Sequence, residues 1–148
     1  MTTKRAKPNS QELGPADYET AKKIVDAKRA EDERIASDRE YELALPLIGK
    51  CFKYRNSYGD AHDSWWLYCR VVAVEKDATS YGAEVTTDQF QDTSIGRIEV
   101  IRWHHYATRG KLDAGYIPIS KSEFQRRVKP ILSKLGLRFV GPNQEVGR

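Results

Sequence analysis

The first part of the chain is a long polar stretch in which large apolar side chains are sparse. After Pro15, residues 16–45 are rich in Ala, Glu, Asp, Lys and Arg and contain neither glycine nor proline. Pro15 suits the first position of a helix, because its φ is already helical and the amide hydrogen that it lacks would have no partner there. Pro46 ends the stretch, because proline disfavours helical backbone in the residue before it. The pattern predicts a charged helix over residues 15–45.

Charged and apolar positions on this helix predict that it is mostly solvated. Opposite charges recur one turn apart, as in Glu19 and Lys23, and each such pair adds about 0.3 kcal/mol. The apolar residues Tyr18 and Val25 are too far apart to form a continuous stripe. A helix of this kind self-associates or lies against a partner, so a homo-oligomer formed through it is one expectation. Its second half is predicted to dock on the rest of the protein through Tyr41, Leu43 and Leu45.

After Pro46 the apolar period changes from that of a helix to that of strands. Turn-forming runs separate five short segments that are rich in aromatic and β-branched residues. These segments are residues 47–55, 65–75, 81–90, 95–103 and 116–119. Five short strands at this spacing predict a small, strongly bent antiparallel barrel of the SH3-like or OB-like kind over residues 46–119. The predicted fold class is therefore α+β, with helices on either side of the barrel.

The C-terminal part shows the pattern of a short amphipathic helix. Ser120 stands three residues before Glu123, which is the spacing of a capping box. Apolar residues then follow one helix face, and basic residues follow the other. The chain thus divides into a disordered basic arm (1–14), the charged helix (15–45), the barrel (46–119), a C-terminal helix with an extension (120–140) and a tail (141–148).

Composition and charge narrow the classes of protein. The chain has 148 residues and a formal net charge of +4, and the excess lies in residues 120–148, with seven Lys and Arg against two Asp and Glu. No segment approaches the roughly 20 apolar residues that cross a bilayer, and the N-terminal residues lack the apolar core of a signal peptide. Two cysteines are too few for a disulfide scaffold. We expect a soluble cytoplasmic protein with reduced thiols and no membrane partner.

Residues 49–74 form the densest block of aromatic and basic side chains, and a hairpin loop over residues 56–64 would fold this block on itself. Centring the loop on Asp60 predicts the strand register. In this register Phe52 faces Tyr68 and Tyr54 faces Trp66 on one side of the sheet. On the other side Cys51 meets Cys69, Lys53 meets Leu67, and Arg55 meets Trp65.

The predicted register leaves a basic and aromatic surface in solvent. The side with Phe52 and Trp66 is the more apolar and is taken as core, so Lys53, Arg55 and Trp65 face outward. Cations follow phosphates and an indole stacks on a base, which is the chemistry that binds single strands. The alternative is that these aromatics belong to the barrel core and that the arginine only packs beside a tryptophan. With the outer face of the last helix, the candidate nucleic-acid-binding residues are Lys53, Arg55, Trp65, Arg126, Lys129 and Lys134.

One sequence block resembles a known group of proteins. The segments GKCFKYRNSYG, WWLYCRV and GRIEV, within residues 47–103, resemble small uncharacterised proteins of tailed bacteriophages and prophages. The resemblance implies a phage or mobile-element origin, and therefore the cytoplasm of a bacterial host. It brings no activity and no catalytic residues with it.

Catalytic and metal chemistry finds little support in the sequence. Asp60, His62 and Asp63 share the predicted loop, but three polar loop residues are more often solvated than metal-bound. A zinc site built from Cys51, Cys69 and one of His104 and His105 lacks a fourth ligand. No nucleophile motif, P-loop or dinucleotide fingerprint occurs, and the acids Glu84, Asp88 and Glu99 are the alternating acids of solvated strands. We predict no metal, no cofactor and no catalytic residue.

The leading functional hypothesis is a non-enzymatic binding module of phage type. It would engage nucleic acid, single strands or RNA rather than a specific duplex, because the sequence contains no helix-turn-helix. The rival hypothesis is a protein-binding factor that captures a host protein or joins a larger assembly, which the long polar helix favours.

Overall fold

The structure is a computed structural model that describes residues 14–57, 59, 63–77, 82–93, 95–140 and 145–147. The chain forms two compact units, Met1–Ile35 and Ala36–Arg148. The predicted basic arm lies outside the described residues except for Gly14. Among the described residues no helix is both long and apolar enough to cross a membrane.

The long N-terminal helix is confirmed as α1, Pro15–Ala44. Every residue from 15 to 35 is exposed, including Ile24 at 65% and Val25 at 54%. The last turns of α1, residues 36–44, belong to the second unit. There Ser37 donates a hydrogen bond to the backbone oxygen of Asp77 at 2.7 Å, and Tyr41 packs on the core. The predicted docking of Leu43 and Leu45 is wrong, because both remain at least 37% exposed.

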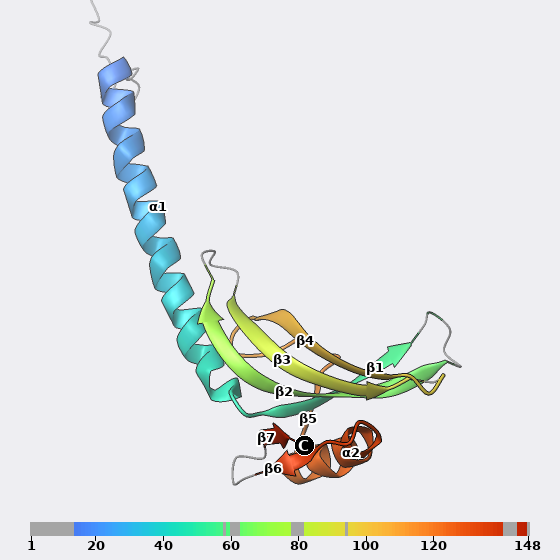
Figure 1. The fold of residues 1–148 in the computed structure, drawn as a ribbon. Helices are drawn as coiled ribbons and strands as arrows, with labels where there is room; N and C mark the ends of the chain where they lie inside the picture. The colour runs from blue at the N-terminus through green and yellow to red at the C-terminus, as the bar shows by residue number, and fades with distance from the viewer. Residues whose placement is uncertain are drawn as a thin grey trace, which may run out of the picture. The chain divides into compact units, whose positions relative to one another are not determined.

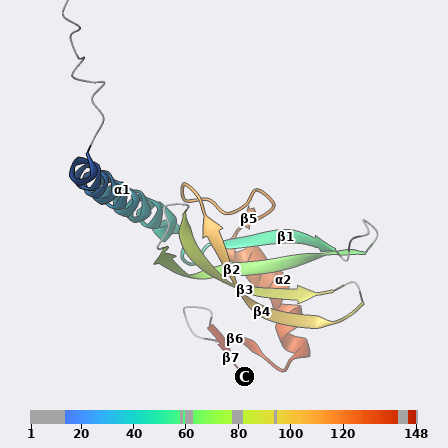
Figure 2. The same ribbon diagram turned by 90° about the horizontal axis from the view of Figure 1, so that it is seen from above.

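A single antiparallel sheet of five strands forms the body of the second unit, in the order β4-β3-β2-β1-β5 (Figure 2). The strands are β1 (Cys51–Ser57), β2 (Ser64–Lys76), β3 (Ala83–Asp92), β4 (Ile98–Ala107) and β5 (Ile117–Ile119). A short helical turn, η2 (Leu45–Leu47), leads from α1 into β1. The five strands and their antiparallel pairing were predicted from the alternating pattern and are confirmed.

The predicted closure of this sheet into a barrel is wrong. Closure would need β4 to pair with β5, but within the described part of the chain β4 pairs with β3 and β5 pairs with β1. With only three residues, β5 offers too short an edge to complete the ring of hydrogen bonds. The sheet is bent and open, as the curvature of β2 and β3 in Figure 1 shows.

The C-terminal helix α2 (Lys121–Lys134) lies on the convex side of the sheet together with β6 (Arg138–Val140) and β7 (Glu145–Gly147) (Figure 1). Ser120 caps α2 by accepting a hydrogen bond from the amide of Glu123 at 3.0 Å. Residues 138–140 were predicted as an extension and residues 145–147 as part of a tail, but they pair with each other as a two-stranded ladder. This pairing is favoured because Phe139 and Val146 cover the cluster around α2.

Each face of the sheet has its own apolar cluster. We call the side covered by α2 the α2 face and the other the concave face. Buried residues on the α2 face are Cys51, Phe90, Phe124, Val128, Ile131 and Leu132. Buried residues on the concave face are Ala44, Phe52, Leu67, Cys69, Val71, Val74, Ala83, Val85 and Ala107.

The predicted hairpin register is wrong by one residue. Phe52 is opposite Cys69 rather than Tyr68, and Arg55 is opposite Trp66 rather than Trp65. Asp60, the predicted centre of the loop, lies outside the described residues. In the predicted register Arg70 would share the core side with Phe52, whereas the observed register places Leu67 and Cys69 there. Burying a guanidinium costs far more than burying a leucine or a thiol, which favours the observed register.

Candidate nucleic-acid interface

The two adjacent tryptophans of β2 point to opposite faces of the sheet. Trp65 is only 8% exposed, and its indole nitrogen donates a hydrogen bond to Oε1 of Gln91 at 2.7 Å. Trp65 is therefore a core residue and cannot stack on a ligand, so its predicted outward position is wrong. Trp66 is half-buried on the α2 face.

The observed register gathers Trp66 with the two predicted cations of β1. The Nζ atom of Lys53 lies 4.7 Å from the centre of the Trp66 ring, and the guanidinium carbon of Arg55 lies 5.3 Å from it. Arg55 also donates to the hydroxyl oxygen of Ser64 at 2.7 Å from Nη2, which fixes the guanidinium beside the ring. The predicted grouping of two cations with one tryptophan is thus present, with Trp66 in the place given to Trp65.

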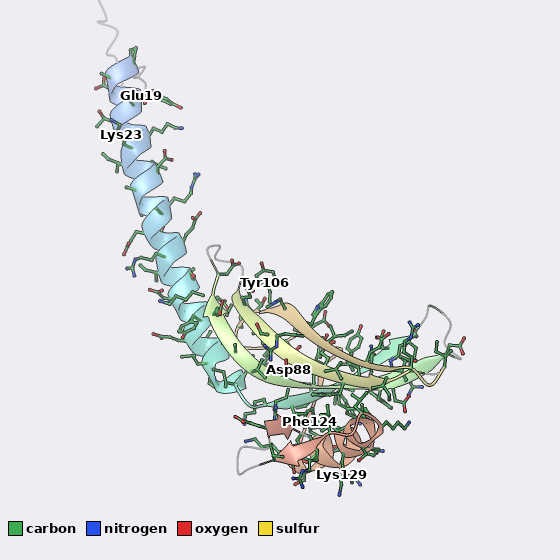
Figure 3. The ribbon with its side chains drawn as sticks, in the orientation of Figure 1. Glu19, Lys23, Asp88, Tyr106, Phe124 and Lys129 are labelled. Atoms are coloured by element: carbon green, nitrogen blue, oxygen red, sulfur yellow. The ribbon has the colours of Figure 1, made fainter. Side chains whose placement is uncertain are left out.

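The helix α2 brings further cations to the same face. Its apolar side is buried against the sheet, and its other side carries exposed basic residues. In Figure 3 the Phe124 side chain points toward the sheet and the Lys129 side chain points away from it. Arg126 and Arg127 line the same surface depression as Trp66 and Tyr68 of β2.

A groove of about 350 Å³ joins these elements on the α2 face. We call it the basic groove, and it is lined by Trp66, Tyr68, Asp92, Arg126, Arg127, Pro130 and Ile131. Trp66 connects the groove to the cations of β1, since Lys53 and Arg55 lie over its ring. The two separate basic regions that the sequence suggests therefore meet at one place in the fold.

The balance of charge at the basic groove is positive. Among the described residues that line the groove, Asp92 supplies the carboxylate, and it forms an ion pair with Lys134 at 2.5 Å. Lys134 is therefore engaged in holding α2 to β3 rather than free for a ligand. Lys129 is exposed on the outer side of α2 and does not line the groove. Of the six predicted residues, Lys53, Arg55 and Arg126 are brought together around Trp66.

Tyr68 adds a neutral hydroxyl to the groove. Burial raises the pKa of its phenol, and the nearby charge of Arg127 opposes that rise. The hydroxyl is therefore protonated near neutral pH and can donate a hydrogen bond to a phosphate or a base. Sequence reasoning missed Trp66 and Tyr68 as site residues. Weighing the cost of placing Arg70 on the core side would have found both.

The predicted side-by-side placement of the cysteines is wrong. Cys51 pairs across the ladder with Arg70 and joins the cluster on the α2 face, while Cys69 pairs with Phe52 and joins the concave cluster. Both thiols are free and buried. Burial raises the pKa of Cys51, and it raises the pKa of Cys69 to about 12. Neither thiol is an activated nucleophile.

Other candidate chemistry is spread out in the fold. Asp88 forms an ion pair with Arg102 at 2.7 Å, and Glu99 accepts a hydrogen bond from Gln91 at 2.6 Å. Of the predicted loop cluster, Asp60 and His62 lie outside the described residues. No group of three or more His, Cys, Asp or Glu that could hold a metal ion occurs in the described part of the chain.

Comparison with protein-family models, curated proteins and solved structures finds no significant match. The likeness to bacteriophage proteins and the expected lack of enzymatic activity therefore stay predictions. The basic groove is interpreted from its own geometry.

Proposed function

We propose that this chain is a non-enzymatic binding module of phage type that holds single-stranded DNA or RNA in the basic groove. The observation that carries the proposal is the meeting of one half-buried tryptophan with four cations, Lys53, Arg55, Arg126 and Arg127. Cations spaced along a groove follow a phosphate backbone, and an aromatic ring among them stacks on a base.

The groove favours single strands over duplex. Its volume is about 350 Å³, and its walls are a strand and the side of a helix. The helix α2 is packed on the sheet by Phe124 and Val128, so it is not free to enter a major groove. A flexible strand can instead turn its bases toward Trp66 and its phosphates toward the arginines.

Fluorescence anisotropy with labelled poly-dT and a short RNA tests this proposal. If the four cations each meet a phosphate, affinity should fall about 50-fold between 50 and 200 mM salt. Trp66→Ala should weaken binding by about 1 to 3 kcal/mol, which is the usual worth of one stacked base. Lys53→Glu should weaken it about tenfold or more, since a cation is replaced by a repelling charge.

Two substitutions outside the groove serve as matched controls. Lys111→Glu makes the same charge change in an exposed turn, and Trp103→Ala removes an exposed tryptophan from the concave face. Both should leave the affinity for poly-dT within about twofold. No binding of either probe at 50 mM salt, or equal losses in the control variants, would contradict the proposal.

A second candidate, a protein-binding factor, is favoured by α1. From Pro15 to Ile35 the helix exposes every side chain, including the apolar Tyr18, Ile24 and Val25. A host protein or a second copy could use this surface. If nucleic acid fails to bind, capture of host proteins by the full chain and its loss on deleting residues 1–35 would support this candidate.

A further inference from the structure

A second cavity lies on the concave face, away from the basic groove. Its volume is about 530 Å³, within the usual range of ligand pockets. Side chains from β1, β2, β3, β4 and the segment after β4 line it. Those that carry the argument are Tyr54, Gln89, Gln91, Trp103, His105 and Tyr116.

The floor of this cavity is polar where a sheet core is usually apolar. Thr87, Gln89 and Gln91 occupy alternate positions of β3 on the concave face and are at most 6% exposed. Burying a side-chain amide is costly unless hydrogen bonds satisfy it. Apolar residues would fill these positions without that requirement, so the amides point to a need for polar groups on this face.

A hydrogen-bond network holds both amides in fixed orientations. Gln91 accepts from the Trp65 indole at 2.7 Å and donates to Glu99 at 2.6 Å. The Nε2 atom of Gln89 lies 3.2 Å from the Thr87 hydroxyl oxygen and 3.2 Å from Nε2 of His105. Oε1 of Gln91 also lies 3.4 Å from Nδ2 of Asn56. These partners hold both amides as preorganised polar groups in the wall of the cavity.

Aromatic rings form the walls. Tyr54 and Tyr116 are stacked with their ring centres 4.8 Å apart, and His105 meets Tyr116 edge-on at 5.0 Å. Trp103 on β4 is 55% exposed and lines the opening. Rings in such an arrangement offer flat surfaces to a planar ligand.

The lining selects against anions. Among the described residues that line it there is no lysine or arginine, and Asp113 contributes a carboxylate. Burial lowers the pKa of His105 and raises the pKa of Tyr116 to about 12, so the imidazole and the phenol are both neutral near pH 7. A phosphate or carboxylate placed here would meet a carboxylate and no counter-charge.

We propose that this cavity binds an uncharged planar heterocycle with amide-like edges, namely a nucleobase or its free nucleoside, at a site separate from the basic groove. Aromatic walls stack on the faces of such a ring. Fixed glutamine amides pair with its edge, as asparagine and glutamine do with the donor and acceptor of adenine. Because the described residues of the lining include no lysine or arginine, we assign the site to the free base or nucleoside rather than to a nucleotide.

Isothermal titration calorimetry of the full chain with adenosine, guanosine, cytidine and uridine tests this assignment. At least one nucleoside should bind, and its 5′-monophosphate should bind at least tenfold more weakly. Trp103→Ala, at an exposed position that leaves the core intact, should weaken nucleoside binding about tenfold. Gln89→Met, which keeps the volume but removes the amide, should do the same, with circular dichroism to verify the fold.

The controls separate this site from the proposed nucleic-acid interface. Trp66→Ala on the α2 face should leave nucleoside binding unchanged, and Trp103→Ala should leave poly-dT binding unchanged. No heat of binding with any of the four nucleosides at millimolar concentration would overturn the assignment, whatever poly-dT does. Displacement of labelled poly-dT by the free nucleoside would overturn the proposal of a separate site.

Discussion

At the scale of single residues, the neighbours Trp65 and Trp66 show how one strand serves two faces. Side chains alternate along β2, so Trp65 enters the concave face, where its indole meets Gln91 at 2.7 Å. Trp66 enters the α2 face, where two cations lie over its ring. A tryptophan thus orients an amide at position 65 and forms a candidate stacking platform at position 66.

Buried acidic groups predict how stability depends on pH. Burial raises the pKa of Cys69 from 9.0 to about 12 and that of Tyr116 from 10.0 to about 12. Above pH 9 the unfolded chain loses the thiol proton while the folded chain keeps it, so the free energy of unfolding falls as pH rises toward 12. The contribution of Cys69 lost between pH 7 and pH 10.5 is about 2 kcal/mol.

Urea unfolding at pH 7, 9 and 10.5 measures this loss, and Cys69→Ala provides the control. The variant should be less stable at pH 7 but should lose less stability on going to pH 10.5, because it has no thiol at this position. An identical pH dependence in the variant and the parent chain would contradict the assigned role of Cys69.

At the scale of elements, α2 links the fold to the candidate site. One side buries Phe124, Val128, Ile131 and Leu132, and the side that meets the groove carries Arg126 and Arg127. The burial of the first set positions the second, so the groove depends on how firmly α2 is formed and docked.

Loss of the N-cap of α2 is expected to lower stability. Ser120→Ala removes the hydroxyl that accepts from the Glu123 amide at 3.0 Å and should cost about 1 kcal/mol of unfolding free energy. Ser133→Ala changes an exposed serine within α2 and should change stability by less than about 0.5 kcal/mol. Chemical denaturation of both variants measures the difference, and equal effects would show that the cap is not the cause.

Periodicity predicted the elements better than it predicted their pairing. The spacing of apolar residues located α1, the five strands and α2, because each pattern depends on residues close in sequence. Register depends on the opposite strand, and the choice between Trp65 and Trp66 required weighing where Arg70 would fall. The polar floor around Gln89 and Gln91 was missed because an alternating strand gives no sign that its inward positions are amides with partners.

At the scale of the molecule, the five-stranded sheet of the second unit carries a different kind of surface on each of its two faces. The α2 face gathers cations around Trp66, and the concave face gathers amides and neutral aromatics around a cavity. Here β3 places Thr87, Gln89 and Gln91 on the concave side, while β2 keeps buried apolar residues there.

We expect truncations that end in the first unit and in the second unit to change the thermal stability differently. Residues 15–35 are all exposed, whereas Ser37, Tyr41 and Ala44 pack within the second unit. Deleting residues 1–35 should therefore leave the thermal midpoint of unfolding within about 2 °C. Deleting residues 1–44 removes buried contacts worth about 2 kcal/mol or more and should lower the midpoint by about 10 °C.

Light scattering on the same truncations tests self-association through α1. Its exposed apolar residues predict that the full chain has twice the mass of one chain and that the chain lacking residues 1–35 is monomeric. A second variant replaces Ile24 and Val25 with Gln in the full chain. This change keeps the helix but removes two exposed branched side chains, so the variant should also be monomeric. A full chain that is already monomeric at high concentration would exclude self-association and leave this surface to a different partner.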